Sequence, residues 1–170
     1  MNKYVLIAEE GERDLVGQVE ELFGVDLADA EVLVTGVGAV NVIRSLQTLD
    51  RDAEVYNIGY AGSANFDLGS WVEVHEVRLN HPNVTYPEPA LPLQNWDFKD
   101  RQALLAGGKL KHALCYTNCD FVLASDYKDC VFDMELAFIA SLGFKSLRSL
   151  KYVSDNLSLH AYHEHTHGVE

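Results

Sequence analysis

The sequence has few basic residues and no long hydrophobic run, and each shortage excludes a class of protein. Thirteen Lys and Arg stand against 26 Asp and Glu, a formal net charge of −13. Nucleic acids and anionic membranes are bound by basic surfaces, so neither is expected as a partner. No apolar run is long enough to cross a bilayer. The stretch from Met1 to Ile7 is followed at once by acidic residues, which is not the pattern of a secretory signal, so a cytoplasmic protein is expected.

Cysteine is also scarce. Cys115, Cys119 and Cys130 are odd in number and match no zinc-binding spacing, which favours reduced thiols. Cys119 has no histidine in a recognisable partner motif, so it is a weak candidate nucleophile. Four histidines in the tail suggest a solvated or tag-like segment with at most incidental metal binding: His160, His163, His165 and His167. Neither a metal nor a cofactor is expected.

The four prolines all fall within residues 81–93, the one long irregular segment. Such a segment in a compact domain tends to be a lid or an interface element. The 170 residues suffice for one domain with a real core, and no repeat or linker interrupts them. We therefore expect a single domain over residues 1–170.

Strand-like and helix-like segments alternate along the chain, which is typical of an α/β layered fold. Expected strands are 3–8, 31–35, 54–58, 71–79, 113–116, 121–124 and 147–153, and expected helices are 12–23, 41–49 and 98–106. Glycines follow two of the strands, at 36–38 and at 59–62, where a backbone can approach a ligand closely. In such folds ligands gather at the carboxyl ends of strands. These glycine turns, residues 117–121 and Asp155 all fall at such ends.

Residues 131–140 are expected to form a helix that is apolar nearly all round and therefore buried. Glu135 lies within it, and burying a carboxylate without a partner is costly. Two interpretations stay open. Glu135 reaches the surface or a structural Arg, or its partner is a ligand.

Four short motifs occur in order: Thr-Gly-Val-Gly-Ala-Val-Asn at 35–41, Asn-Ile-Gly-Tyr-Ala-Gly at 57–62, Asp-Met-Glu at 133–135 and Val-Ser-Asp at 153–155. Together they resemble the purine nucleoside phosphorylase and nucleosidase superfamily, and most of all the methylthioadenosine/S-adenosylhomocysteine nucleosidases. The resemblance implies a three-layer α/β/α sandwich with a mixed, twisted central sheet. It also implies hydrolysis of the N-glycosidic bond of a purine nucleoside or a 5′-thio-adenosine analogue.

The resemblance implies three catalytic carboxyl groups. Asp155 matches the acid that protonates the purine, Glu12 the residue that activates water, and Glu135 the residue that binds the ribose hydroxyls. Glu9 and Glu10 are alternatives to Glu12, and Asp155 has the alternative role of capping a turn. The implied substrate-binding residues are Met134, Phe121, Val122, Ser154, Tyr60, Ala61 and Gly62. This chemistry needs one carboxyl that stays protonated and another that stays ionised.

The chain departs from the family pattern at several positions. Asn57 stands where phosphorylases carry a phosphate-binding Arg, which favours water as the nucleophile. Tyr60 replaces a small residue, and Lys151 stands where nucleosidases usually have Arg. The hairpin before the second strand is trimmed, and the closing C-terminal helix is largely missing.

Three alternatives to a hydrolase follow: a phosphate-dependent phosphorylase, a non-catalytic protein that binds a nucleoside or base, and a structural interaction domain. The resemblance also implies a homodimer. The loop around residues 86–92 is expected at or near the partner subunit.

Overall fold

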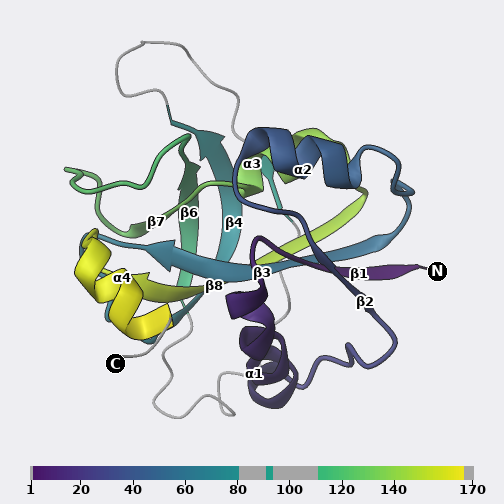
Figure 1. The fold of residues 1–170 in the computed structure, drawn as a ribbon, viewed down its shortest axis with the longest axis horizontal. Coiled ribbons are helices and arrows are strands. Elements are labelled where there is room, and N and C mark those ends of the chain that lie inside the picture. The colour runs from purple at the N-terminus through teal and green to yellow at the C-terminus, as the bar shows by residue number, and fades with distance from the viewer. Residues whose placement is uncertain (1, 81–90, 94–110, 167–170) are drawn as a thin grey trace.

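The structure is a computed structural model that describes residues 2–80, 91–93 and 111–166, with Figure 1 showing its ribbon. The elements in chain order are β1 (Lys3–Ile7), the 3₁₀ helix η1 (Glu10–Glu12), α1 (Arg13–Phe23), β2 (Glu31–Val34), α2 (Ala39–Leu46), β3 (Glu54–Gly62), β4 (Trp71–Leu79), β5 (Leu91–Pro92), β6 (Lys111–Thr117), β7 (Cys130–Asp133), α3 (Leu136–Ser141), β8 (Ser146–Asp155) and α4 (Leu159–Thr166). In this part of the chain no helix is long and apolar enough to cross a membrane.

The strands form one mixed sheet. β2, β1, β3 and β8 run parallel to their neighbours in that order, with nine residue pairs joining β3 and β8. β4 pairs with β8 and β5 in antiparallel fashion and with β6 in parallel fashion. β6 in turn pairs with β7 in parallel. The predicted α/β class with a mixed sheet is confirmed.

The expected three-layer sandwich is not confirmed, because part of the sheet closes on itself. β7 pairs with β3 through Gly62 and Phe132, which completes a ring of β3, β8, β4, β6 and β7. The register of the β3–β8 ladder shifts between Ala61 and Gly62. Such an irregularity bends a strand and increases its twist, which allows closure of the ring.

Helices nevertheless cover both faces of the open part of the sheet. Val5 and Ile7 of β1 pack with α1, whereas Leu6 between them packs in the cluster that contains α2 and α3. This alternation is the two-residue period of a strand. Figure 1 shows α2 and α3 together on one side of β1 and β3, with α1 on the other.

The helix expected over residues 131–140 is wrong in its first half. Cys130–Asp133 is a strand, β7, and the helix α3 begins only at Leu136. Val131 and Phe132 are residue types that favour strands, and pairing with β6 decides the outcome. Asp133 marks the boundary, since its Oδ2 accepts a hydrogen bond from the Leu136 N–H at 2.8 Å.

Other local expectations need correction as well. Residues 121–124 form no strand, and β3 runs on through its glycines to Gly62 instead of turning after Ile58. The histidine-rich tail contains a helix, α4. The expected helix at 98–106 lies outside the described residues, as does the loop around 86–92 except for the short strand β5.

Candidate functional site

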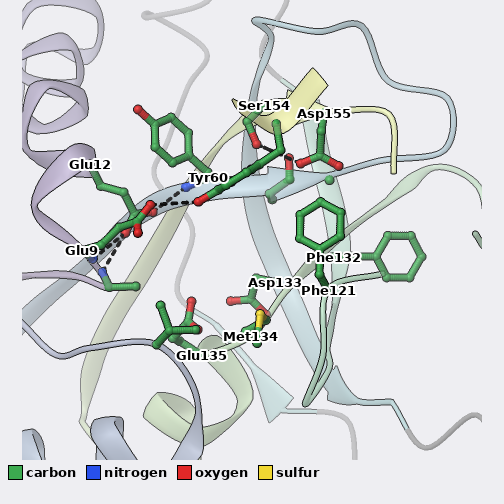
Figure 2. A pocket seen from close by; sticks show the side chains of 15 residues that line it. Glu9, Glu12, Tyr60, Phe121, Phe132, Asp133, Met134, Glu135, Ser154 and Asp155 are labelled. Atoms are coloured by element: carbon green, nitrogen blue, oxygen red, sulfur yellow. Dashed lines mark hydrogen bonds between the residues drawn. The ribbon is translucent and has the colours of Figure 1, made fainter. Parts of the chain in front are cut away.

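One pocket lies where the carboxyl ends of β1, β3, β7 and β8 meet (Figure 2). Its lining combines acidic, aromatic and small side chains. The lining residues are Ala8, Glu9, Glu12, Val37, Tyr60, Ala61, Gly62, Phe121, Phe132, Asp133, Met134, Glu135, Ser154, Asp155 and Tyr162. The pocket therefore holds all three carboxyl groups that the sequence assigned to chemistry.

Glu12 is held by the backbone on both of its carboxylate oxygens. Oε1 accepts from the N–H groups of Ala8 at 2.7 Å and Glu9 at 3.2 Å, and Oε2 accepts from Tyr60 N–H at 2.7 Å. Burial raises the pKa of Glu12, while Lys151 and these three N–H groups oppose the rise. Gly59 makes this geometry possible, because an added Cβ would overlap Glu12 Oε2. Glu12 is thus a fixed, buried carboxyl group.

Asp155 is buried at the end of β8 and also has both oxygens engaged. Oδ1 accepts from Leu157 N–H at 2.9 Å, and Oδ2 lies 3.0 Å from the Ser154 hydroxyl. A Cβ at Gly62 would come within 2.6 Å of Oδ1. The bond to Leu157 shows that the turn-capping role is real. Asp155 also lines the pocket, so capping the turn is compatible with the role of acid that the resemblance implied.

Glu135 lies at the start of α3 and joins it to the glycine turn after β2. Its Oε2 accepts a hydrogen bond from Gly38 N–H at 3.0 Å. Burial and then the nearby Asp133 raise the pKa of Glu135 to about 8. The sequence left two interpretations of Glu135 open, a surface or Arg partner and a ligand partner. Glu135 lines the pocket, whose described lining contains no Arg, which favours the ligand.

Behind the pocket, Lys151 and Asp133 form a buried ion pair. Lys151 Nζ lies 3.0 Å from Asp133 Oδ2, and the two side chains are 2% and 1% exposed. Burial by itself lowers the pKa of Lys151, but the acidic groups around it, Asp133 foremost, raise the pKa above its ordinary value. Asp133 Oδ1 also accepts from Thr117 Oγ1 at 2.6 Å. A buried pair needs such additional partners to offset desolvation.

The side of the pocket near Asp155 is apolar and aromatic. Figure 2 shows the rings of Phe121 and Phe132 on this side, with Met134 beneath them. Val122 does not line the main pocket but a smaller adjoining hollow, which it shares with Phe121 and Leu157. Flat apolar surfaces of this kind suit a planar heterocycle.

Two tyrosines, Tyr60 and Tyr162, also line the pocket. Tyr162 of α4 donates a hydrogen bond to Glu9 Oε1 at 2.8 Å, and its ring meets Phe121 edge-on with centroids 5.5 Å apart. Tyr60 donates to Gly11 O at 3.1 Å, and burial with the nearby Glu12 raises its pKa to about 12. The tail expected to be solvated therefore supplies part of the site.

Most of the residues that the sequence singled out come together here. Of the three catalytic and seven substrate-binding residues that the resemblance implied, nine line the pocket, and Val122 lies beside it. Sequence reasoning missed Tyr162, Phe132 and the pairing role of Asp133. Asp133 was detectable as part of the Asp-Met-Glu motif, and Phe132 as its neighbour. Tyr162 gave no signal, since it lies in a short polar segment.

No group of three or more His, Cys, Asp and Glu side chains is arranged to hold a metal ion within residues 2–80, 91–93 and 111–166. Of the three cysteines, Cys115 and Cys130 are buried and Cys119 is exposed. Burial raises the pKa of Cys115 well above its ordinary value. None of the three lines the pocket.

Comparison with known proteins gives matches among solved structures alone. No family model and no curated protein sequence matches the chain. A 5′-methylthioadenosine/S-adenosylhomocysteine nucleosidase from S. pneumoniae, solved with a transition-state inhibitor, has a TM-score of 0.72 at 19% identity, covering 98% of this chain and 92% of that chain. The nucleosidase from Neisseria meningitidis has a TM-score of 0.71 at 21% identity, covering 97% and 91%.

A second activity occurs among the similar structures. The futalosine hydrolase of Helicobacter pylori has a TM-score of 0.66 at 19% identity, covering 98% of this chain and 91% of that chain. At such identities the likeness concerns the fold. The chain has the fold of these nucleosidases, and its resemblance to the nucleoside phosphorylase and nucleosidase superfamily is confirmed at that level.

Proposed function

We propose that this protein is a nucleosidase that hydrolyses the N-glycosidic bond of a purine nucleoside or a 5′-substituted analogue. The observation that carries the proposal is the meeting of Glu12, Glu135 and Asp155 in one pocket beside an aromatic wall. Cleavage of this bond passes through a cation-like ribosyl group. It therefore needs an acid for the leaving base and carboxylates for the developing positive charge.

Asp155 is the acid in this proposal. The base lies against Phe121 and Phe132, so that its imidazole nitrogen meets the Asp155 carboxyl. Ser154 Oγ lies 3.0 Å from Asp155 Oδ2 and 3.4 Å from Ala61 O. The hydroxyl can therefore donate its hydrogen bond to the Asp155 carboxylate or to the Ala61 carbonyl. This arrangement lets Ser154 keep Asp155 in place whether or not it carries a proton.

Glu135 and Glu12 act on the ribosyl side. Met134 packs against the sugar and Glu135 accepts hydrogen bonds from its hydroxyl groups. Glu12 orients a water molecule for attack at the anomeric carbon. Burial raises the pKa of Glu12, and Lys151 and three backbone N–H groups oppose that rise by stabilising the ionised form. The water gives its proton to Glu12 as the bond to the base breaks.

Water is favoured over phosphate as the nucleophile. Asn57 is buried, accepts a hydrogen bond from Ser149 Oγ at 2.8 Å, and does not line the pocket. The lining contains no Lys, Arg or His within the described part of the chain. A phosphate ion would meet carboxylates there and no cation to neutralise it.

The test is release of free base from a panel of purine nucleosides, with and without phosphate, followed by chromatography. We expect free base and free sugar at the same rate in both conditions. Sugar 1-phosphate in the presence of phosphate would make the protein a phosphorylase. Binding without any release would make it a non-catalytic nucleoside-binding protein. If nucleosides are neither bound nor cleaved, a structural interaction domain is the alternative that is left.

The proposal includes a homodimer, as in the family that the chain resembles. The segment around residues 86–92 is proposed to lie at or near the partner subunit. Light scattering at micromolar concentration measures the mass directly, and a mass of about 19.0 kDa, that of one chain, would count against a dimer.

A further inference from the structure

Among the described residues, the ionisable side chains that line the pocket are acids and tyrosines, with no Lys, Arg or His. Five of its side chains are acidic: Glu9, Glu12, Asp133, Glu135 and Asp155. Lys151, which pairs with Asp133, is buried and does not line the pocket. A ligand entering the pocket therefore meets these acidic groups without meeting Lys151, although the raised pKa of Glu135 keeps that group largely protonated near neutral pH. Anionic groups on the ligand are disfavoured by like-charge repulsion in a partly desolvated space.

The acidic groups are also divided between two ends of the pocket. In Figure 2, Glu9 and Glu12 lie on one side, and Asp155 lies with Phe121 and Phe132 on the other. If the base occupies the aromatic side and the sugar lies over Met134, the 5′ position extends away from the base. It then reaches the side that Glu9 and Tyr162 form.

This side is polar. Glu9 is partly exposed to the pocket and its Oε1 already accepts the Tyr162 hydroxyl at 2.8 Å. An ionised carboxylate has about four acceptor positions and no donor, so Glu9 offers further acceptor capacity to a ligand. An apolar group placed here would remove water from the carboxylate without replacing its hydrogen bonds.

Resting on the proposed function, we propose that Glu9, held by Tyr162, selects nucleosides with a hydrogen-bond donor at the 5′ position. The substrate class is then neutral or cationic nucleosides that carry a 5′-hydroxyl or 5′-amino group. Nucleosides with a 5′-alkylthio group are poorer substrates, and nucleoside 5′-phosphates are excluded.

The test compares kcat/KM for four adenine nucleosides that differ at the 5′ position: hydroxyl, amino, methylthio and monophosphate. The wild-type protein is expected to prefer the hydroxyl and amino compounds over the methylthio compound by about 10-fold or more, since a site built around a polar group rejects an analogue that lacks it. Glu9→Leu should reverse this preference. Glu9→Gln should keep the preference for the hydroxyl compound over the methylthio compound. It should lose the preference for the amino compound over the methylthio compound.

The neighbouring Glu10 provides a matched control. Glu10 is exposed, pairs with Arg13 and does not line the pocket, so Glu10→Leu should leave the ratio of methylthio to hydroxyl turnover unchanged. Melting temperatures of all variants identify any loss due to unfolding. Glu9→Gln has nearly the shape of the natural residue and keeps the test valid if Glu9→Leu fails to fold.

The inference and the proposed function fail in different ways. Base release with a preference for the methylthio compound, unchanged in Glu9→Gln and Glu9→Leu, would overturn the inference alone. If no nucleoside is cleaved, the hydrolase proposal fails. Calorimetric binding of the same four compounds then decides the inference, and equal affinity for hydroxyl and methylthio compounds would overturn it.

Discussion

Glu12 and Asp155 reach the same pocket from two places beside β3, and the groups around them differ. Burial raises the pKa of Glu12, and three backbone N–H groups and Lys151 oppose that rise. Asp155 accepts a hydrogen bond from the Leu157 N–H and lies 3.0 Å from the Ser154 hydroxyl, and Leu157 lines the same adjoining hollow. Two carboxyl groups in such unlike surroundings can hold different protonation states at one pH. In the proposed reaction, the Asp155 end donates the proton and the Glu12 end accepts one.

The largest effect is expected at the acidic end. Asp155→Asn should lower purine release by about 10²- to 10⁴-fold, because the amide can donate a hydrogen bond but cannot transfer a proton. The shape of the side chain is nearly kept, so the melting temperature should change little. Turnover at saturating nucleoside is measured together with thermal unfolding. Unchanged turnover would leave Asp155 with its capping role alone and remove the distinction between the two ends.

The next effect is expected at the charged end. Lys151→Met leaves Asp133 buried without its cation and should lower the free energy of unfolding by about 3–5 kcal/mol. Urea denaturation measures this loss. Lys145→Met is the matched control, since Lys145 pairs with Asp52 at the surface and such pairs contribute about 0–1 kcal/mol. An equal free energy of unfolding in the two variants would show that the buried pair contributes no more to stability than the surface pair.

The two glycines of β3 allow the ends to be disturbed one at a time. Gly59→Ala should displace Glu12, and Gly62→Ala should displace Asp155, each with a loss of about 1–3 kcal/mol in stability from overpacking. Both should also lower turnover. Gly17→Ala in α1 has nothing within 4 Å of the added methyl group and should be neutral or stabilising by up to about 1 kcal/mol. Full activity in either β3 variant would contradict the close approach on which its carboxyl group depends.

The smallest effect is a dependence of stability on pH, because Glu135 keeps partial access to solvent. Its pKa rises from an ordinary value of 4.5 to about 8 in the folded protein. The folded state therefore binds more protons than the unfolded state between these values, and the free energy of unfolding should fall as pH rises through this window. Glu135→Gln does not titrate and should show a shallower fall. Urea denaturation at several pH values checks this, and identical slopes would contradict the shifted pKa.

Local patterns predicted much of this molecule. The glycine turn after β2, the glycines of β3 and the acidic residue after β1 are local features. One residue from each of these segments lines the pocket: Val37, Gly62 and Glu12. The two carboxylates of Glu12 and Asp155 explain why glycine is needed at 59 and 62, since each occupies the space of a side chain. The sequence indicated a close backbone approach there, although toward a ligand and not toward the protein's own acids.

The parts that escaped prediction depend on contacts between distant segments. Apart from Asp133 and Glu135, the run of 131–140 is apolar. Its periodicity therefore cannot distinguish strand from helix. Pairing of β7 with β6 and with Gly62 decides the matter. Closure of the sheet and the place of Tyr162 likewise rest on partners far away in the sequence, and residue patterns do not reveal such partners.

The hydrogen bond between Tyr162 and Glu9 also has a consequence for folding. It joins residues 153 positions apart, one just after the first strand and the other in α4. Contacts of such separation form late, since the entropy of closing the intervening loop must be overcome first. During synthesis, the sheet can assemble through β8 before α4 is available. The last wall of the pocket is then added to a fold that already exists, so the appearance of binding activity would report the docking of α4, later than the appearance of the sheet.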